Sequence, residues 1–281
     1  MAGDAGDAGD AGDAGDAGDA GDAGDVGNVG QVGGGRIPDR IDIPFLTEPD
    51  VAAQIFDRTE FGERNWATIW YAWVVLGEFG STDWINNIVV PAPPNLNDSK
   101  LEIENELKPM VLNERPDALG EILGQRKEFM RYFLAVMHSR SHSHPATFRV
   151  LTIANLVATM VVMHFKEHYN RSRPSQICPA LLPPFPVPGH ASYPSGHATQ
   201  AFLFARVLED ILPNGQQASM KKVLQALAKR IARNREIAGF HYKSDSDAGA
   251  DLADAIFGIL TDPSQVPKFT DAMSAAKDEW S

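Results

Sequence analysis

Residues 147–168, TFRVLTIANLVATMVVMHFKEH, are the most continuously apolar helix-compatible stretch of this 281-residue chain. Within them, residues 150–165 contain no formally charged side chain, a run of 16, whereas a membrane-spanning helix needs about 20 apolar residues. A helix that is apolar on nearly all sides belongs in the centre of a bundle. The stretch therefore predicts an all-α protein built around one buried helix.

Other stretches repeat apolar residues at three- and four-residue intervals, which is the spacing of one helix face. They predict helices over residues 47–61, 65–79, 117–138, 195–212, 218–238 and 244–260. The helical spacing of Trp66, Trp70 and Trp73 favours packing in the core. Alternating strand-like patterns are scarce, and nothing divides the chain after residue 36. We therefore expect a single α-helical domain over residues 36–281.

The first 35 residues have a different composition. Ala-Gly-Asp is repeated eight times over residues 2–25, without any Lys or Arg. Such a segment cannot bury enough apolar surface to fold, so residues 1–35 are predicted to be a disordered, low-complexity tail. Its aspartates contribute to the formal net charge of −12.

The distribution of charged residues and the composition of the first residues bear on which partners and which cellular location are expected. Basic residues do not cluster, which argues against a nucleic-acid-binding protein. The start of the chain lacks the basic and apolar regions of a secretory signal. We therefore expect a soluble, cytoplasmic protein with no membrane span. Cys178 is the only cysteine, so no intrachain disulfide can form.

Two short segments have the residue types of an oxyanion site. Lys166 and Arg173 lie about two helical turns apart at the end of the apolar helix, and a proline follows. Ser195, Gly196 and His197 begin another predicted helix. Free backbone N–H groups at a helix start, together with a serine hydroxyl, favour an anion. Each segment taken alone is also consistent with ordinary helix capping.

A third segment places a cation and a histidine–carboxylate pair close in sequence. Arg235 continues the apolar stripe of its helix and should point inward, where a guanidinium needs an anionic partner. His241 and Asp245 are four residues apart. A carboxylate bonded to one ring nitrogen leaves the other nitrogen free to attack or ligate. Ser244 is predicted to cap the following helix, with Asp247 completing a capping box.

The motifs Lys-x6-Arg-Pro, Pro-Ser-Gly-His and Arg-x5-His-x3-Asp, in this order, resemble those of the type 2 phosphatidic acid phosphatase (PAP2) superfamily. The resemblance is to its soluble branch, the bacterial class A acid phosphatases and vanadium-dependent haloperoxidases. It covers residues 166–245 and implies a helical bundle of the PAP2/haloperoxidase type. One departure is Asn234, because the third motif usually begins with Ser-Arg.

The resemblance implies metal-independent hydrolysis of a small-molecule phosphomonoester. His241 would attack phosphorus and become a phosphohistidine, Asp245 would orient it, and His197 would act as general acid and then base. The residues that would bind the non-bridging oxygens are Lys166, Arg173, Ser195, Gly196 and Arg235. Their fixed positive charge would replace a metal ion, so no cofactor and no metal ligands are implied.

Two other functions are consistent with the same cage of residues. In a haloperoxidase it would hold vanadate, with His241 as the vanadium ligand and with halide and peroxide as substrates. Pro183–Pro186 and the pair Ala198-Thr199 resemble that branch, whereas the chain length and compact motif spacing favour a phosphatase. A non-catalytic oxyanion-binding protein is the third reading. A homo-oligomer is possible, although no residue pattern indicates one directly.

The remaining histidines and the cysteine have simpler interpretations. His190, seven residues before His197, could line the entrance of the site, but a polar residue of a proline-rich loop is the favoured interpretation. His138, His142 and His144 lack a flanking carboxylate or cysteine, so a metal site is not expected there. Cys178 is interpreted as inert, because the site already has a histidine nucleophile.

Overall fold

The computed structural model describes residues 59–62, 65–126 and 128–281. All the regular elements in this described part are helices, which confirms the predicted all-α class. The predicted tail over residues 1–35 lies outside the described residues. So does most of the predicted helix over residues 47–61, whose last residues, 59–61, are not helical.

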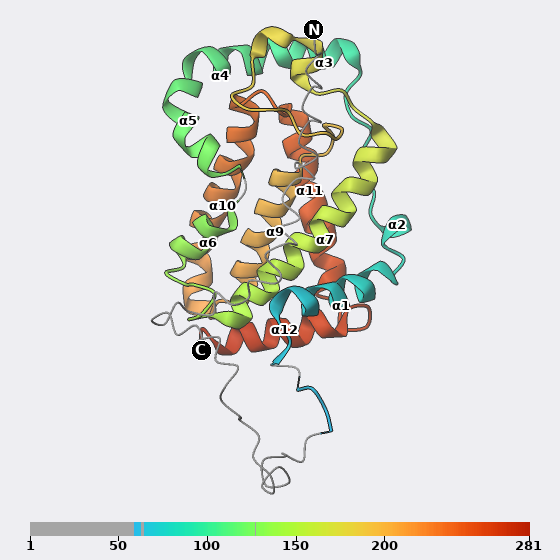
Figure 1. Cartoon of the computed structure of the whole chain (residues 1–281), viewed down its shortest axis with the longest axis vertical. Helices are drawn as coiled ribbons and strands as arrows, with labels where there is room; N and C mark the ends of the chain where they lie inside the picture. The colour runs from blue at the N-terminus through green and yellow to red at the C-terminus, as the bar shows by residue number, and fades with distance from the viewer. Residues whose placement is uncertain (1–58, 63–64, 127) are drawn as a thin grey trace, which may run out of the picture.

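Four long helices form the body of the molecule. They are α7 (Pro145–Tyr169), α9 (Gly196–Ile211), α10 (Asn214–Ile237) and α11 (Lys243–Leu260). Helix α9 packs against the other three, and Figure 1 shows it in the middle of the bundle. The four correspond to predicted helices, with ends that differ by a few residues. Helix α7 was predicted to be the central helix, but α9 holds that position, and the face of α7 that carries Met163 is not buried.

Shorter helices cover the two ends of this bundle. In Figure 1, α1 and α12 run across its lower end, and α3 and α4 run across its upper end. The shorter elements are α1 (Thr68–Gly80), α2 (Trp84–Asn87), α3 (Leu96–Glu102), the π-helix η4 (Ile103–Leu107), α4 (Lys108–Asn113), α5 (Arg115–Gly124), α6 (Met130–Val136), α8 (Pro174–Ile177), the 3-10 helix η5 (Pro179–Leu181) and α12 (Pro267–Asp278).

The predicted helix over residues 117–138 is wrong in its middle, because α5 ends at Gly124 and α6 begins at Met130. The reason is tertiary hydrogen bonding by Gln125, which is fully buried. Its side-chain oxygen accepts from the Asn234 amide at 2.9 Å, and its backbone oxygen lies 3.2 Å from Nε2 of His197. These partners replace the hydrogen bonds of a continuous helix.

The tryptophans in and just before α1 do not pack in the core, which corrects a second prediction. Trp66, Trp70 and Trp73 are 38%, 53% and 51% exposed, whereas Tyr71 and Val75 are buried. Both sets of residues have helical spacing. Periodicity therefore identified the helix but could not decide which of its faces meets the bundle.

The up-and-down topology brings the three sequence motifs to one end of the bundle. Because α7, α9, α10 and α11 follow one another with reversals of direction, the ends of α7 and α10 lie beside the starts of α9 and α11 (Figure 1). Gly249 allows α11 to approach the start of α9 closely. A Cβ there would lie 2.8 Å from the Ser195 carbonyl oxygen. The Ser195 N–H donates to the Asp245 carbonyl at 3.0 Å, linking two motifs.

One helix of the described part, within Pro145–Ile177, is long and apolar enough to cross a membrane by length and composition. Half of its most apolar window is buried inside the protein. Helix α7 lies in this range and packs against α1, α9 and α12. The absence of a membrane span and the cytoplasmic location stay predictions.

Candidate active site

A cavity of about 80 Å³ lies where the four helix ends meet. A single water needs only about 15 Å³ of such space, so the cavity can hold a larger solute. None of the described residues that line it is a carboxylate. The lining residues are Arg126, Thr159, Val162, Met163, Lys166, Arg173, Phe185, Pro188, His190, Gly196, His197, Gln200, Arg235, Phe240 and His241.

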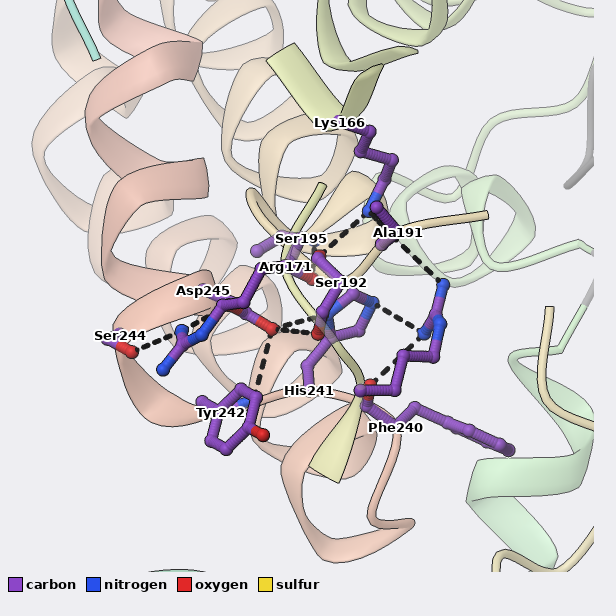
Figure 2. A network of polar contacts seen from close by, with 12 residues as sticks. Lys166, Arg171, Ala191, Ser192, Ser195, Phe240, His241, Tyr242, Ser244 and Asp245 are labelled. Carbon is purple, nitrogen blue, oxygen red and sulfur yellow. Dashed lines mark hydrogen bonds and ion pairs between the residues drawn. The ribbon is translucent and has the colours of Figure 1, made fainter. Parts of the chain in front are cut away.

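Lys166 and Arg173 approach the cavity from the end of α7 and the segment after it. Both are 2% exposed. The Lys166 ammonium donates to the carbonyl oxygens of Ala191 and Ser192, each at 2.8 Å (Figure 2). Burial, reinforced by the charge of Arg173, holds the pKa of Lys166 well below its usual value. Two buried cations this close together favour an anion in the cavity.

Arg235 brings a third cation from the last turn of α10. It is 2% exposed, in keeping with its predicted inward orientation. One guanidinium nitrogen, Nη2, donates to the Ile122 carbonyl at 2.8 Å. The side chain of Arg235 also lines the cavity, so a third buried cation lies beside Lys166 and Arg173.

His241 and Asp245 form a pair at the start of α11. Nδ1 of His241 lies 2.9 Å from Oδ2 of Asp245, and Nε2 lies 3.5 Å from Nη1 of Arg173. Burial is the largest influence on the pKa of His241. With the nearby cations, and against the Asp245 hydrogen bond, it lowers that pKa to about 3. The imidazole is therefore neutral at ordinary pH, with its Nε2 edge toward the arginine.

Asp245 is fully buried and has several donors besides His241. Nη1 of Arg171 donates to Oδ1 at 2.6 Å, the Ser192 hydroxyl donates to Oδ2, and the Tyr242 N–H donates to Oδ2 at 3.2 Å (Figure 2). Burial alone would raise the pKa of this carboxyl. The hydrogen bond with His241 and the charge of Arg171 outweigh it and lower the pKa to about 2.

The start of α9 supplies Ser195, Gly196 and His197. Nε2 of His197 lies 3.2 Å from the Gln125 carbonyl oxygen, and its ring lies 4.8 Å from that of Phe129. Burial, followed by the charges of Arg235 and His241, holds the pKa of His197 well below its usual value. The Ser195 hydroxyl caps the helix and accepts from the Ala198 N–H at 3.4 Å. Unlike Gly196 and His197, Ser195 is not among the residues that line the cavity.

Comparison with known proteins points in the same direction as the motifs. The chain is 32% identical over 91 residues to a non-specific acid phosphatase of Providencia stuartii. This match covers 32% of the chain and 34% of the relative, so it spans about a third of that protein. No family model matches the chain. The three motifs meet at one cavity, and the acid phosphatase is a sequence relative. This similarity supports the predicted resemblance to the PAP2 superfamily.

A solved PAP2 structure was also matched. It is the transmembrane PAP2 type phosphatidylglycerolphosphate phosphatase of Bacillus subtilis, with 14% sequence identity and a TM-score of 0.45. The match covers 68% of this chain and 90% of that one. Membership of the soluble branch stays a prediction.

Two residues of this site were not singled out from the sequence. Arg171 contacts Asp245 and lies 3.8 Å from the ring centroid of Tyr242. Its other nitrogen, Nη2, donates at 3.2 Å to Glu102, which belongs to α3. A buried carboxylate needs a cation, but spacing alone could not choose Arg171 among the neighbouring basic residues. Glu102 lies far from the motifs in sequence, so no local pattern indicated it.

The structure corrects two smaller predictions. His190 is not only a loop residue, because it lines the cavity and its Nδ1 lies 3.0 Å from Nη2 of Arg173. Burial and the charges of Lys166 and Arg173 lower its pKa to about 4. Ser244 is not the cap of α11. The helix begins after Tyr242, whose backbone N–H donates a hydrogen bond to the Asp245 carboxylate.

The pKa of His241 predicts a loss of stability in acid. In the unfolded chain the imidazole of His241 binds a proton near pH 6.5, whereas in the folded protein its pKa is lowered to about 3. Stability is therefore complete above pH 6.5 and declines as pH falls through this window. At pH 5 the cost is about 2 kcal/mol. Asp245, with its pKa lowered from 3.8 to about 2, adds a loss below about pH 4.

Urea denaturation of the wild type and of His241→Gln at pH 7.5 and 5.0 measures this contribution. The variant is expected to lose about 2 kcal/mol less than the wild type between the two pH values. An identical pH dependence in both proteins would show that His241 titrates normally in the folded state.

Proposed function

We propose that this protein is a PAP2-type phosphatase that hydrolyses phosphomonoesters through a phosphohistidine on His241. The observation that carries the proposal is the orientation of the His241 ring. Its Nδ1 edge is held by Asp245, and its Nε2 edge faces a cavity with three buried cations and no described carboxylate in its lining. A neutral imidazole next to a bound, charge-neutralised phosphoryl group is an activated nucleophile.

In the first step, Nε2 of His241 forms a bond to phosphorus as the ester P–O bond breaks. The Nδ1 proton is shared with Asp245, which stabilises the positive charge that develops on the ring. His197 gives its proton to the departing oxygen, so the product is a neutral alcohol. Burial disfavours protonated His197 in the structure, but the negative charge of a bound phosphate would favour it.

In the second step, His197 accepts a proton from water as the water oxygen forms a bond to phosphorus. The P–N bond breaks, its electron pair returns to His241, and inorganic phosphate leaves. His197 thus ends the cycle protonated, as it began. The acid of one step becomes the base of the next, as microscopic reversibility requires for two related displacements.

Lys166, Arg173 and Arg235 are proposed to bind the non-bridging oxygens in both steps. Phosphoryl transfer depends mainly on positioning and on stabilising the charge of these oxygens. Fixed cations in a buried site can do this without reorganisation. We therefore propose that no metal ion is needed. No group of three or more metal-ligating side chains was found among the described residues.

Purified protein is expected to hydrolyse 4-nitrophenyl phosphate equally well, within about twofold, with and without EDTA. Vanadate, which readily becomes five-coordinate, is expected to inhibit at concentrations about 100-fold below KM, as transition-state analogues do. Loss of turnover in EDTA would contradict metal independence. Absence of turnover, with peroxide-dependent bromide oxidation by the vanadate-loaded protein, would replace the phosphatase with the peroxidase function.

A further inference from the structure

Arg171 lies between two carboxylates that come from distant parts of the chain. Its Nη1 donates to Oδ1 of Asp245 at 2.6 Å, and its Nη2 donates to Oε1 of Glu102 at 3.2 Å. Asp245 belongs to the first turn of α11, whereas Glu102 is the last residue of α3. One planar guanidinium therefore joins the helices that cover the bundle to the carboxylate that holds His241.

Glu102 is held in place from two sides. Its Oε2 accepts from the Ser244 N–H at 3.1 Å, and the Ser244 hydroxyl donates to its Oε1 at 2.7 Å. The helix that follows Glu102, η4, places Ile103 and Leu107 in a buried cluster with Tyr242. The side chain of Glu102 is 15% exposed, so little water separates its charge from the guanidinium.

The guanidinium of Arg171 is fixed as well. Its Nη2 donates to the Ser99 hydroxyl at 2.8 Å, and its Nη1 donates to the Ser244 hydroxyl at 2.8 Å (Figure 2). Its central carbon lies 3.8 Å from the centroid of the Tyr242 ring. These contacts restrict where the guanidinium can lie, so Oδ1 of Asp245 is bound in one place and Oδ2 faces the imidazole.

The second carboxylate also changes the charge that faces His241. Arg171 and Asp245 alone form a neutral pair, whereas Glu102, Arg171 and Asp245 together carry a net negative charge. The His241 ring becomes positive as its Nε2 bonds to phosphorus. In a buried site, a negative network stabilises this positive charge more than a neutral ion pair does.

We propose that Glu102 and Arg171 are positioning residues for the reaction of His241. Arg171 orients Asp245, and Glu102 offsets the charge of Arg171, so that the negative charge of Asp245 remains effective at the ring. Neither Glu102 nor Arg171 lines the cavity, and both act through Asp245. The inference rests on the proposed function, since it takes His241 to be the nucleophile.

The first test is the steady-state rate of Glu102→Gln on 4-nitrophenyl phosphate at pH 7.5. Glutamine keeps the size of the side chain and removes its charge. We expect kcat to fall about 10-fold and KM to stay within about twofold of wild type, because the cations that face the phosphoryl group are unchanged. Glu102→Asp keeps the charge and should retain more activity than Glu102→Gln.

The second test does not depend on turnover. The proton on Nδ1 of His241 is observed by NMR in protein with isotopically labelled histidine, and it is assigned by its loss in His241→Gln. A hydrogen bond to a strongly accepting carboxylate moves this resonance to low field. Glu102→Gln is expected to move it to higher field. Arg171→Lys should do the same, because lysine lacks the planar fork that contacts both carboxylates.

Glu104→Gln is the matched control. Glu104 lies two residues after Glu102, and its 63% exposed side chain pairs with Lys108 at the surface. Its kcat and the Nδ1 resonance of His241 should match those of wild type. Circular dichroism confirms that each variant is folded.

Three outcomes would overturn the inference. They are an unchanged Nδ1 resonance in folded Glu102→Gln, a kcat of that variant within about twofold of wild type, and an equal loss of kcat in Glu102→Asp. Turnover by wild type with any of these outcomes would leave the phosphatase proposal standing. Absence of turnover by wild type would contradict that proposal, and the resonance would still decide whether Glu102 and Arg171 position the His241 ring.

Discussion

Replacement of His241 by alanine is expected to lower kcat for phosphomonoester hydrolysis by about 10⁴-fold or more. Removal of a nucleophile eliminates the covalent route, and only binding and electrostatic stabilisation of the transition state remain. The fold should survive, because Asp245 keeps its bonds from Arg171, Ser192 and the Tyr242 backbone. Activity would therefore disappear from a protein that still binds vanadate or phosphate.

The measurement is the steady-state rate on 4-nitrophenyl phosphate, with the helical circular dichroism signal as the check on folding. His142→Ala is the matched control. His142 is exposed and comes just before the start of α7, whereas Lys166 lies near its other end. With 25 residues, that helix is about 37 Å long. The proposal would be falsified if His241→Ala retained kcat within about 10-fold of wild type.

The intermediate can be sought directly. Phosphohistidine survives alkali, so wild type mixed with labelled substrate and quenched in base should carry label on the protein. His241→Ala should carry none. The leaving group 4-nitrophenolate needs little protonation, so His197→Ala should still be labelled and should release phosphate slowly. Label on another residue would identify a different nucleophile.

Replacement of Asp245 by asparagine is expected to affect both activity and stability. An amide can stabilise the wrong tautomer of His241, and a comparable change in a catalytic triad lowers kcat by about 10⁴-fold. The change also removes the carboxylate that faces the buried guanidinium of Arg171 at 2.6 Å. Loss of one partner from a buried ion pair costs about 3–5 kcal/mol, and here Glu102 keeps part of the pairing.

Asp247→Asn on the same helix is the control. Its side chain is 62% exposed and pairs with Lys243 at the surface, so the free energy of unfolding should change by less than about 1 kcal/mol. Urea denaturation at pH 7.5 and the steady-state rate are measured for both variants. A purely structural role for Asp245 predicts lower stability with unchanged kcat in the folded fraction, and that result would rule out its orienting role.

The helices that surround the site were predictable because each has a local pattern. Residues 147–168 are apolar enough to predict a long helix of the bundle, and α9, α10 and α11 each show one clear apolar stripe. The composition of residues 147–168 did not show that α9 would hold the central position. The predictions for individual helices were wrong in two situations. In one, two faces of the same helix had equivalent apolar spacing, and in the other, residues distant in sequence formed hydrogen bonds that interrupted a helix. The face of α1 that carries Trp70 has the same periodicity as the buried face, and the helix expected over residues 117–138 breaks where Gln125 meets Asn234 and His197.

The residues of the candidate site also fall into two groups, those predicted from local spacing and those that only the structure identified. The motif residues were found because their spacing within each segment is short, and their placement at one cavity is consistent with the proposed roles. Arg171 and Glu102 were missed because their partners are Asp245 and Ser244, more than 70 positions away in the case of Arg171. His190 was misread because a proline-rich loop has no period that could show which side chains turn inward.

The sequence by itself determined which segments are helical, which residue types can bind an oxyanion, and which histidine has a carboxylate four residues away. Helix periodicity, capping and i,i+4 spacing depend on neighbours within a few residues. Only the tertiary structure decided that Arg171 is the cation facing Asp245, that Gln125 and Phe129 lie against His197, and that Arg126 lines the cavity. These contacts are between segments far apart in the chain, and they exist only once the packing of α7, α9, α10 and α11 has brought the helix ends together.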